Sequence, residues 1–176
     1  SDVGQISKIH SEKTEEQDGI EIVIPVKSDD YDEFYRKATS LYKYFKVIPD
    51  VRGANQEQLK RDLKRDEVIV SKDNWNLVKG KSYAVMGNIA YPLDPNALNL
   101  SWQDDRSELI SAGVVIDFAI GDLEISASRE ALQYTDNTKS IITKKLESII
   151  KALPDVLGEK FEECESLWEV KCLYNE

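Results

Sequence analysis

Apolar and polar residues alternate along several short segments of this chain and recur with helical spacing along others. Alternation at every second position is typical of a strand with one buried face, and apolar residues three or four positions apart are typical of an amphipathic helix. The pattern therefore predicts strands over residues 6–13, 19–26, 68–71, 82–91, 113–120 and 123–126, and helices over residues 28–45, 55–65, 104–111, 138–153 and 155–172.

Turn residues separate these segments. Asp18-Gly19 is a strong hairpin dipeptide, so residues 1–27 are predicted to form a β-hairpin. Residues 73–76 predict a turn. Gly87 lies inside the strand expected over residues 82–91, where a glycine indicates a bulge or a close backbone approach. Pro154 should break or kink the helix that begins at Thr138.

The helix expected over residues 28–45 has a well-defined apolar face. Asp30 and Glu33 have the spacing of a capping box, which favours a helix start there. Five apolar residues share one face, and we interpret that face as packed in the core rather than as a ligand site. These residues are Phe34, Ala38, Leu41, Tyr42 and Phe45.

The order of the elements predicts an α+β fold in which helices pack on one face of a mixed β-sheet. The 176 residues are enough for one sizeable domain with an appendage. We divide them into three parts. Residues 1–27 form a hairpin that is either the tail of a preceding domain or a bridge from it. Residues 28–153 form an α+β domain, and residues 154–176 form a C-terminal helix packed on that domain.

Composition and charge narrow the function classes. The chain is 41% hydrophobic and 32% charged, as is typical of soluble globular proteins. No apolar run approaches the ~20 residues that a membrane helix needs, and the first residues have no signal-peptide pattern. The net charge of −10 argues against binding to nucleic acid or to an anionic membrane surface. We expect a protein without a membrane segment.

Cysteine and histidine usage indicates no metal centre. Cys164 and Cys172 are eight positions apart on one predicted helix, so their Cα atoms would lie about 12 Å apart, too far for a disulfide. Free thiols in a reducing compartment are the better interpretation. His10 is the lone histidine, and the sequence offers neither a set of metal ligands nor a serine–histidine–acid triad.

One local basic cluster stands out from the acidic background. It lies on the short helix expected over residues 55–65. Its cations are Lys60, Arg61, Lys64 and Arg65. A solvated helix face explains the cluster most simply, and a contact with an acidic partner surface is the alternative.

The richest candidate for chemistry is the run from Asp122 to Gln133. A strand pattern ends at Ser126, and a helix pattern begins after Ser128, whose hydroxyl is a plausible N-cap. Arg129 then falls in the first turn, beside Glu130, where it could meet a phosphate shared with the helix amides. The simpler alternative is an exposed arginine paired with a neighbouring carboxylate.

The segment Leu123-Glu124-Ile125-Ser126-Ala127-Ser128-Arg129-Glu130-Ala131-Leu132-Gln133 resembles the catalytic-loop motif in the middle domain of the ninety-kilodalton heat-shock chaperone. The resemblance implies that Arg129 reaches the γ-phosphate of ATP held by a preceding ATPase domain. It also implies that Glu130 orients the arginine and that Gln133 lines the same edge. Ser128 and Arg129 would then be the nucleotide-contacting residues of this chain.

Three separated motifs are similar, in the same order, to stretches of the phage rIIA-type lysis-inhibition proteins. They are residues 19–26, 85–92 and 128–134. Those proteins belong to the GHKL superfamily of ATPases (gyrase, heat-shock chaperone, histidine kinase, MutL). The resemblance implies a transducer-type second domain with a left-handed βαβ crossover. We expect the crossover at the strand pair over residues 113–126 and the helix that begins at residue 138. It also implies that the chain has an ATPase domain as its partner and that it is located in the cytoplasm of an infected bacterium.

A nucleotide site of that superfamily needs glycine-rich segments that this chain lacks. Its eight glycines form neither a G-x-G arrangement nor a P-loop. We therefore expect ATP and Mg²⁺ to be bound only together with a separate ATPase domain, and no cofactor to be held by this chain alone. The chain would be inactive alone and would contribute to ATP hydrolysis.

The sequence also permits two other functions. A non-catalytic protein-interaction module would use the sheet or the final helices to bind a partner protein. Association of two copies of this chain as a homodimer is a further alternative. A large exposed apolar patch on the last helix would favour that module. A small-molecule kinase with a similar crossover fold ranks lower, because its glycine-rich phosphate loop is missing.

Overall fold

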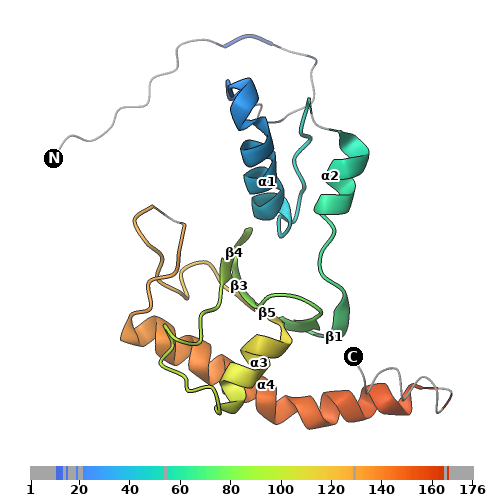
Figure 1. Ribbon diagram of the computed structural model, residues 1–176, viewed down its shortest axis with the longest axis vertical. Coiled ribbons are helices and arrows are strands. Elements are labelled where there is room, and N and C mark those ends of the chain that lie inside the picture. The colour runs from blue at the N-terminus through green and yellow to red at the C-terminus, as the bar shows by residue number, and fades with distance from the viewer. Residues whose placement is uncertain are drawn as a thin grey trace.

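The computed structural model describes residues 11–13, 15, 19, 22–53, 55–128, 130–164 and 166. Its fold is α+β with a mixed β-sheet, as the sequence predicts. The sheet has five strands in the order β1-β2-β5-β3-β4. Figure 1 shows the sheet between two helical groups, α1 with α2 and α3 with α4. The helices are η1 (Ser28–Asp30), α1 (Tyr31–Tyr42), α2 (Gln56–Asp62), α3 (Asp105–Ala112) and α4 (Asp136–Glu162), and the strands are β1 (Val68–Lys72), β2 (Trp75–Val78), β3 (Tyr83–Met86), β4 (Ile89–Pro92) and β5 (Val114–Phe118).

Two tight hairpins build most of the sheet. The turn between β1 and β2 has only two residues, so the prediction of a turn through residue 76 was wrong, and Trp75 is instead a buried strand residue. The strand expected over residues 82–91 is a hairpin of β3 and β4 that turns at Gly87. Gly87 has φ +69°, as the first central position of a type II′ turn requires.

β3 and β5 form the single parallel pair among the described strands. The chain between them runs through β4 and α3, so this pair carries a crossover connection. Within the described residues β5 is the last strand, because residues 123–126 contribute only one bridge residue, Ile125. The predicted return strand is therefore absent, and the handedness of a crossover stays a prediction.

One face of the sheet carries the main core. Val114 and Ile116 of β5 are fully buried against Ile142, Leu146 and Ile149 of α4. α3 adds Leu109 and Ile110 to the same cluster. These contacts give the predicted layer of helices on one sheet face, and the apolar periodicity of α4 is the pattern that identifies that helix in the sequence.

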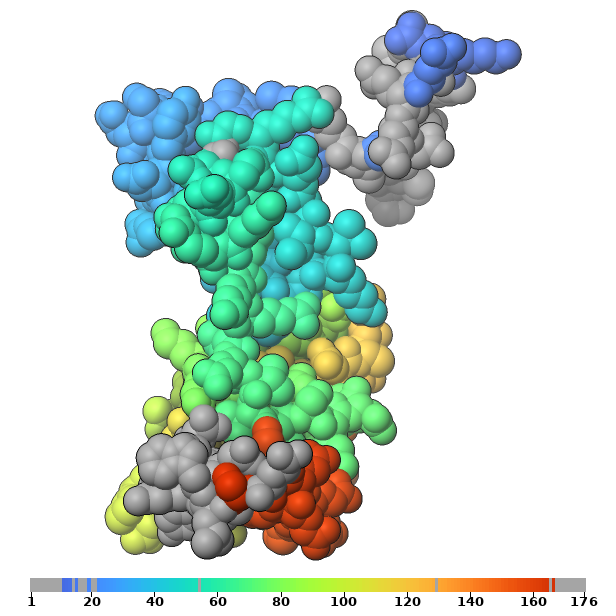
Figure 2. All heavy atoms as spheres, turned by 90° about the vertical axis from the view of Figure 1, so that its right-hand side faces the viewer, coloured from blue at the N-terminus to red at the C-terminus, as the bar shows by residue number. Residues whose placement is uncertain are grey.

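A smaller cluster lies on the opposite face. Val78, Val85 and Val115 are buried there beneath Tyr44, which follows α1. The ring of Tyr44 lies 5.5 Å from that of Tyr83. In Figure 2 the helical lobe of α1 and α2 is joined to the sheet by a narrower neck.

The prediction for the face of α1 was wrong in part. Phe34 and Leu41, assigned to the core, are 42% and 43% exposed. Thr39 is the buried residue of α1 instead. The hydroxyl of Tyr35 donates a hydrogen bond to the carboxylate of Asp62 in α2 at 3.0 Å. The expected capping box is also absent, because the side chain of Asp30 makes no capping hydrogen bond. The lobe contains too few elements to cover the whole apolar stripe.

α4 is one continuous helix that runs through Pro154. The predicted break at this residue does not occur, since residues 155–162 continue the same helix. A kink at Pro154 and the domain division between 153 and 154 stay predictions. Its C-terminal part is tied to β1, where Lys160 Nζ donates to the carbonyl of Ile69 and Lys72 Nζ lies 3.0 Å from Glu159 Oε2. Cys164 is a free thiol, and Cys172 lies outside the described residues.

Part of the predicted N-terminal hairpin lies within the described residues. Residues 22–26, which alternate like a strand, belong to no strand here. Ile22, Val23 and Ile24 are all more than half exposed. The remainder of that prediction falls largely on residues outside the described part, including residues 1–10.

Candidate functional site

The loop between β5 and α4 contains every residue predicted to contact nucleotide. The amide of Gln133 donates to the carbonyl of Glu124 at 2.8 Å, and the amide of Ser126 donates to the carbonyl of Ala131 at 2.8 Å. Ile125 and Leu132 form an antiparallel bridge between these bonds. Residues 124–133 are therefore a small hairpin-like loop, here called the 124–133 loop.

This pairing corrects the prediction of a helix that begins after Ser128. Residues 130–135 are not helical, and the nearest helix, α4, begins at Asp136. Its N-cap is Thr135, whose hydroxyl accepts the amide of Thr138 at 3.3 Å. The free amides of α4 lie beyond Thr135, so Ser128 and Glu130 do not belong to the first turn of that helix.

The base of the loop is firmly held. Leu123 and Leu132 are buried in the main core. The hydroxyl of the fully buried Thr138 accepts the amide of Glu124 at 3.1 Å, which ties the loop to the first turn of α4. Thr135 adds a bond from its hydroxyl to the carboxylate of Glu124 at 2.9 Å. The loop therefore has a fixed direction relative to α4.

The tip of the loop faces solvent. Ser128, Glu130 and Gln133 are exposed, and Arg129 lies outside the described residues. The hydroxyl of Ser128 bonds to that of Ser126 at 3.0 Å, and Ser126 Oγ also accepts the amide of Ala131 at 3.3 Å. Ser128 is thus part of the loop's own bonding, and the predicted role as an N-cap was wrong.

A second candidate site lies on the sheet face opposite α4. A hollow of about 480 Å³ opens between the α1–α2 lobe and the central strands, here called the sheet hollow. Sequence reasoning missed it, because it joins residues up to 76 positions apart, from Tyr44 to Ile120. The available signal was that Val78, Val85 and Val115 each lie next to a residue that faces the main core. Both faces of the sheet are therefore apolar at these positions.

Charged groups close one end of the sheet hollow. Lys43 Nζ lies 2.8 Å from Asp66 Oδ1, and Arg65 Nε donates to the carbonyl of Lys43 at 3.2 Å. The guanidinium of Arg65 stands 5.6 Å from the ring centre of Tyr44. Burial, followed by the charges of Asp66 and Tyr83, raises the pKa of Tyr44, so its hydroxyl stays protonated at neutral pH.

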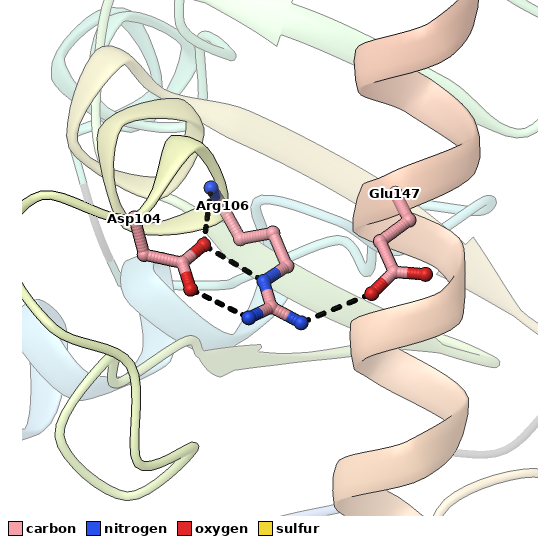
Figure 3. Close-up of polar contacts among 3 residues, drawn as sticks. All are labelled: Asp104, Arg106 and Glu147. Atoms are coloured by element: carbon pink, nitrogen blue, oxygen red, sulfur yellow. Dashed lines mark hydrogen bonds and ion pairs between the residues drawn. The ribbon is translucent and has the colours of Figure 1, made fainter.

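A third polar cluster joins α3 to α4 (Figure 3). Arg106 binds the carboxylate of its N-cap Asp104 through two nitrogens, at 2.7 and 2.5 Å, and reaches Glu147 of α4 at 3.0 Å. Hydrogen bonds from Arg106 lower the pKa of Asp104 to about 2. Because the three side chains satisfy one another, we interpret the cluster as a link between the two helices.

A comparison of the chain with protein-family models, curated proteins and solved structures finds no match. Within the described residues no helix is long and apolar enough to cross a membrane. The same residues contain no group of three histidine, cysteine or acidic side chains that could hold a metal ion.

Proposed function

We propose that this chain is the transducer-type second domain of a GHKL ATPase of the rIIA type, acting in the cytoplasm of a phage-infected bacterium. Arg129 would stabilise the charge that develops on the γ-phosphate of ATP. The ATP and its Mg²⁺ would be held by an ATPase domain in the same or a neighbouring polypeptide. The left-handed crossover and the possibility of a homodimer belong to the same proposal.

The observation that carries the proposal is the contrast between the base and the tip of the 124–133 loop. The base is fixed to α4 through Thr138 and the buried Leu123 and Leu132. The tip, with Ser128 and Glu130, is exposed to solvent. A side chain carried by such a loop can complete a site on another domain, because a rigid base limits the freedom lost on docking.

The same arrangement suggests how docking would be relayed. A force on the loop acts directly on the first turn of α4, a 27-residue helix. Arg106 and Glu147 then connect α4 to α3. Movement of these helices as one body would carry closure of the ATP site toward residues beyond α4.

The test measures ATP hydrolysis by the longer protein that unites this chain with its ATPase domain. Replacing Arg129 by alanine should lower kcat by roughly 10²- to 10⁵-fold, as for other arginines that stabilise a phosphoryl transition state. Arg36→Ala is the matched control, since Arg36 is an exposed arginine of α1. Unchanged hydrolysis in the Arg129 variant would remove the catalytic role.

A second candidate, a protein-interaction module, is favoured by the exposed stripe on α1. Tyr31, Phe34, Ala38 and Leu41 follow at spacings of three, four and three, which is the spacing of a helix seam. Tyr31 is 59% exposed, with Phe34 and Leu41 above 40%. Phe34→Ser with Leu41→Ser should then abolish association measured by sedimentation, whereas Arg129→Ala should leave association unchanged.

A further inference from the structure

The sheet hollow has an apolar floor and apolar sides. Its floor consists of the buried side chains of Val78, Val85 and Val115. Val68 and Ile120 line the hollow and are 48% and 85% exposed. Ile120 leans over the β3–β4 turn, since its Cδ1 is 3.4 Å from the position that a Cβ on Gly87 would occupy. An apolar body in the hollow would remove both exposed side chains from water.

The polar groups of the hollow are mostly hydrogen-bond donors. Among the described residues, Lys46 Nζ and the two terminal nitrogens of Arg65 have no hydrogen-bond or ion-pair partner, and neither has the hydroxyl of Tyr44. The carboxylate of Asp66 is already paired with Lys43. Asp117, exposed on β5, is the other carboxylate of the lining.

Three cations near one end of the hollow are unusual in a chain of net charge −10. The closed end brings together Lys43 and Arg65 with Asp66, and Lys46 adds a further cation on the lobe side. A guanidinium with two unoccupied nitrogens matches the two oxygens of a carboxylate, and it does so best beside an apolar surface that excludes water.

We propose that the sheet hollow binds a small organic anion with an apolar body, an aryl or alkyl carboxylate. The carboxylate contacts Arg65 and Lys46, and the body lies on the valine floor between Val68 and Ile120. A volume of about 480 Å³ suits such a molecule, since ligand pockets commonly measure roughly 300–1,000 Å³. This site is independent of the ATPase proposal, because it lies on the other face of the sheet from α4.

The experiment titrates the intact chain with 4-phenylbutyrate and follows backbone amide shifts by NMR. Saturable shifts are expected at Val78, Val115 and Ile120. 4-Phenylbutyramide has the same body without the charge and should bind at least about tenfold more weakly. Absence of saturable shifts at these amides up to millimolar ligand, or equal binding of the amide, would overturn the proposal.

Variants separate the two parts of the site. Lys46→Gln and Arg65→Gln should each weaken phenylbutyrate binding about tenfold, with Lys151→Gln on α4 as the matched control. Ile120→Ser should weaken the binding of both ligands, whereas Trp102→Ser, at a similarly exposed residue outside the hollow, should not. The side chain of Lys46 makes no hydrogen bond or ion pair with a described residue, so its variant remains decisive if Arg65→Gln disturbs folding. Binding unaffected by Lys46→Gln and Ile120→Ser would contradict the assignment.

Discussion

The hydroxyl of Ser82 lies 2.7 Å from the backbone nitrogen of Val114 and accepts its hydrogen bond. The same hydroxyl donates to the carbonyl of Ile110 at 2.6 Å. Ser82 immediately precedes β3 and is buried. One side chain therefore links the end of α3, the start of β5 and the strand that pairs with β5 in parallel, which is the connection that sets the order of the sheet.

Replacing Ser82 by alanine should lower the free energy of unfolding by about 2 to 3 kcal/mol, because a buried amide and a buried carbonyl lose their partner. Chemical denaturation with a fixed m-value measures the change. Ser111→Ala is the matched control, since Ser111 is exposed and its loss should cost under about 0.5 kcal/mol. Equal effects of the two variants would contradict the role of Ser82.

Gly113 should tolerate no side chain. Its φ is +106°, and a Cβ would lie 2.3 Å from the carbonyl oxygen of Val78 and 2.7 Å from that of Gly80. Gly113→Ala should therefore cost at least about 3 kcal/mol or prevent folding. Gly158→Ala provides the opposite case, because Gly158 lies in α4 with open space around it. That variant should gain about 0.5 to 1 kcal/mol, and a loss there would show that the helix is not formed as described.

The Asp104–Arg106 pair should make stability depend on acid pH. The pKa of the Asp104 carboxyl is about 2 in the folded protein, below its ordinary value of 3.8, so the pair stabilises the fold above about pH 4. That contribution is lost as the pH falls from about 4 to 2. Asp104→Asn should flatten the unfolding free energy over this window, whereas Asp105→Asn, an exposed neighbour, should leave the slope unchanged. A slope retained in the Asp104 variant would assign the acid sensitivity elsewhere.

Pro154 should weaken α4, because it lacks the amide that would bond to the carbonyl of Ile150. Pro154→Ala should raise the unfolding free energy by up to about 3 kcal/mol, measured by denaturation. Asp155→Ala, at the adjacent exposed position, should change it by under about 0.5 kcal/mol. A destabilised Pro154 variant would instead mean that the proline shapes the helix so that Val156 can reach the core.

The helices were predicted well because their signals are local. The apolar spacing of Ile142, Leu146 and Ile149 and the cap at Thr135 both lie within a few residues of the bonds that they describe. The short helix expected over residues 55–65 is likewise found as α2, whose N-cap Asn55 accepts the amides of Glu57 and Gln58. Local sequence is sufficient where the hydrogen bonds are local.

The candidate site was predicted only as a segment. The sequence identified the run around Ser128 and Glu130, but the expected helix there is a loop closed by the pairing of Glu124 with Gln133. A serine followed by charged and apolar residues is compatible with a helix start as well as with a loop. The backbone pairing across the loop therefore decided which of the two forms. The exposed Phe34 shows the same limit, because helical spacing marks an apolar face without saying what covers it.

The sequence by itself determined the α+β class, the positions of most helices and the acidic surface, since periodicity and composition fix what each segment can bury. Only the tertiary structure decided that residues 82–91 fold back at Gly87, that α4 passes through Pro154, and that Tyr44 and Arg65 meet above Val115 to form a hollow. These outcomes depend on contacts between residues far apart in the chain, whose energies no local pattern contains.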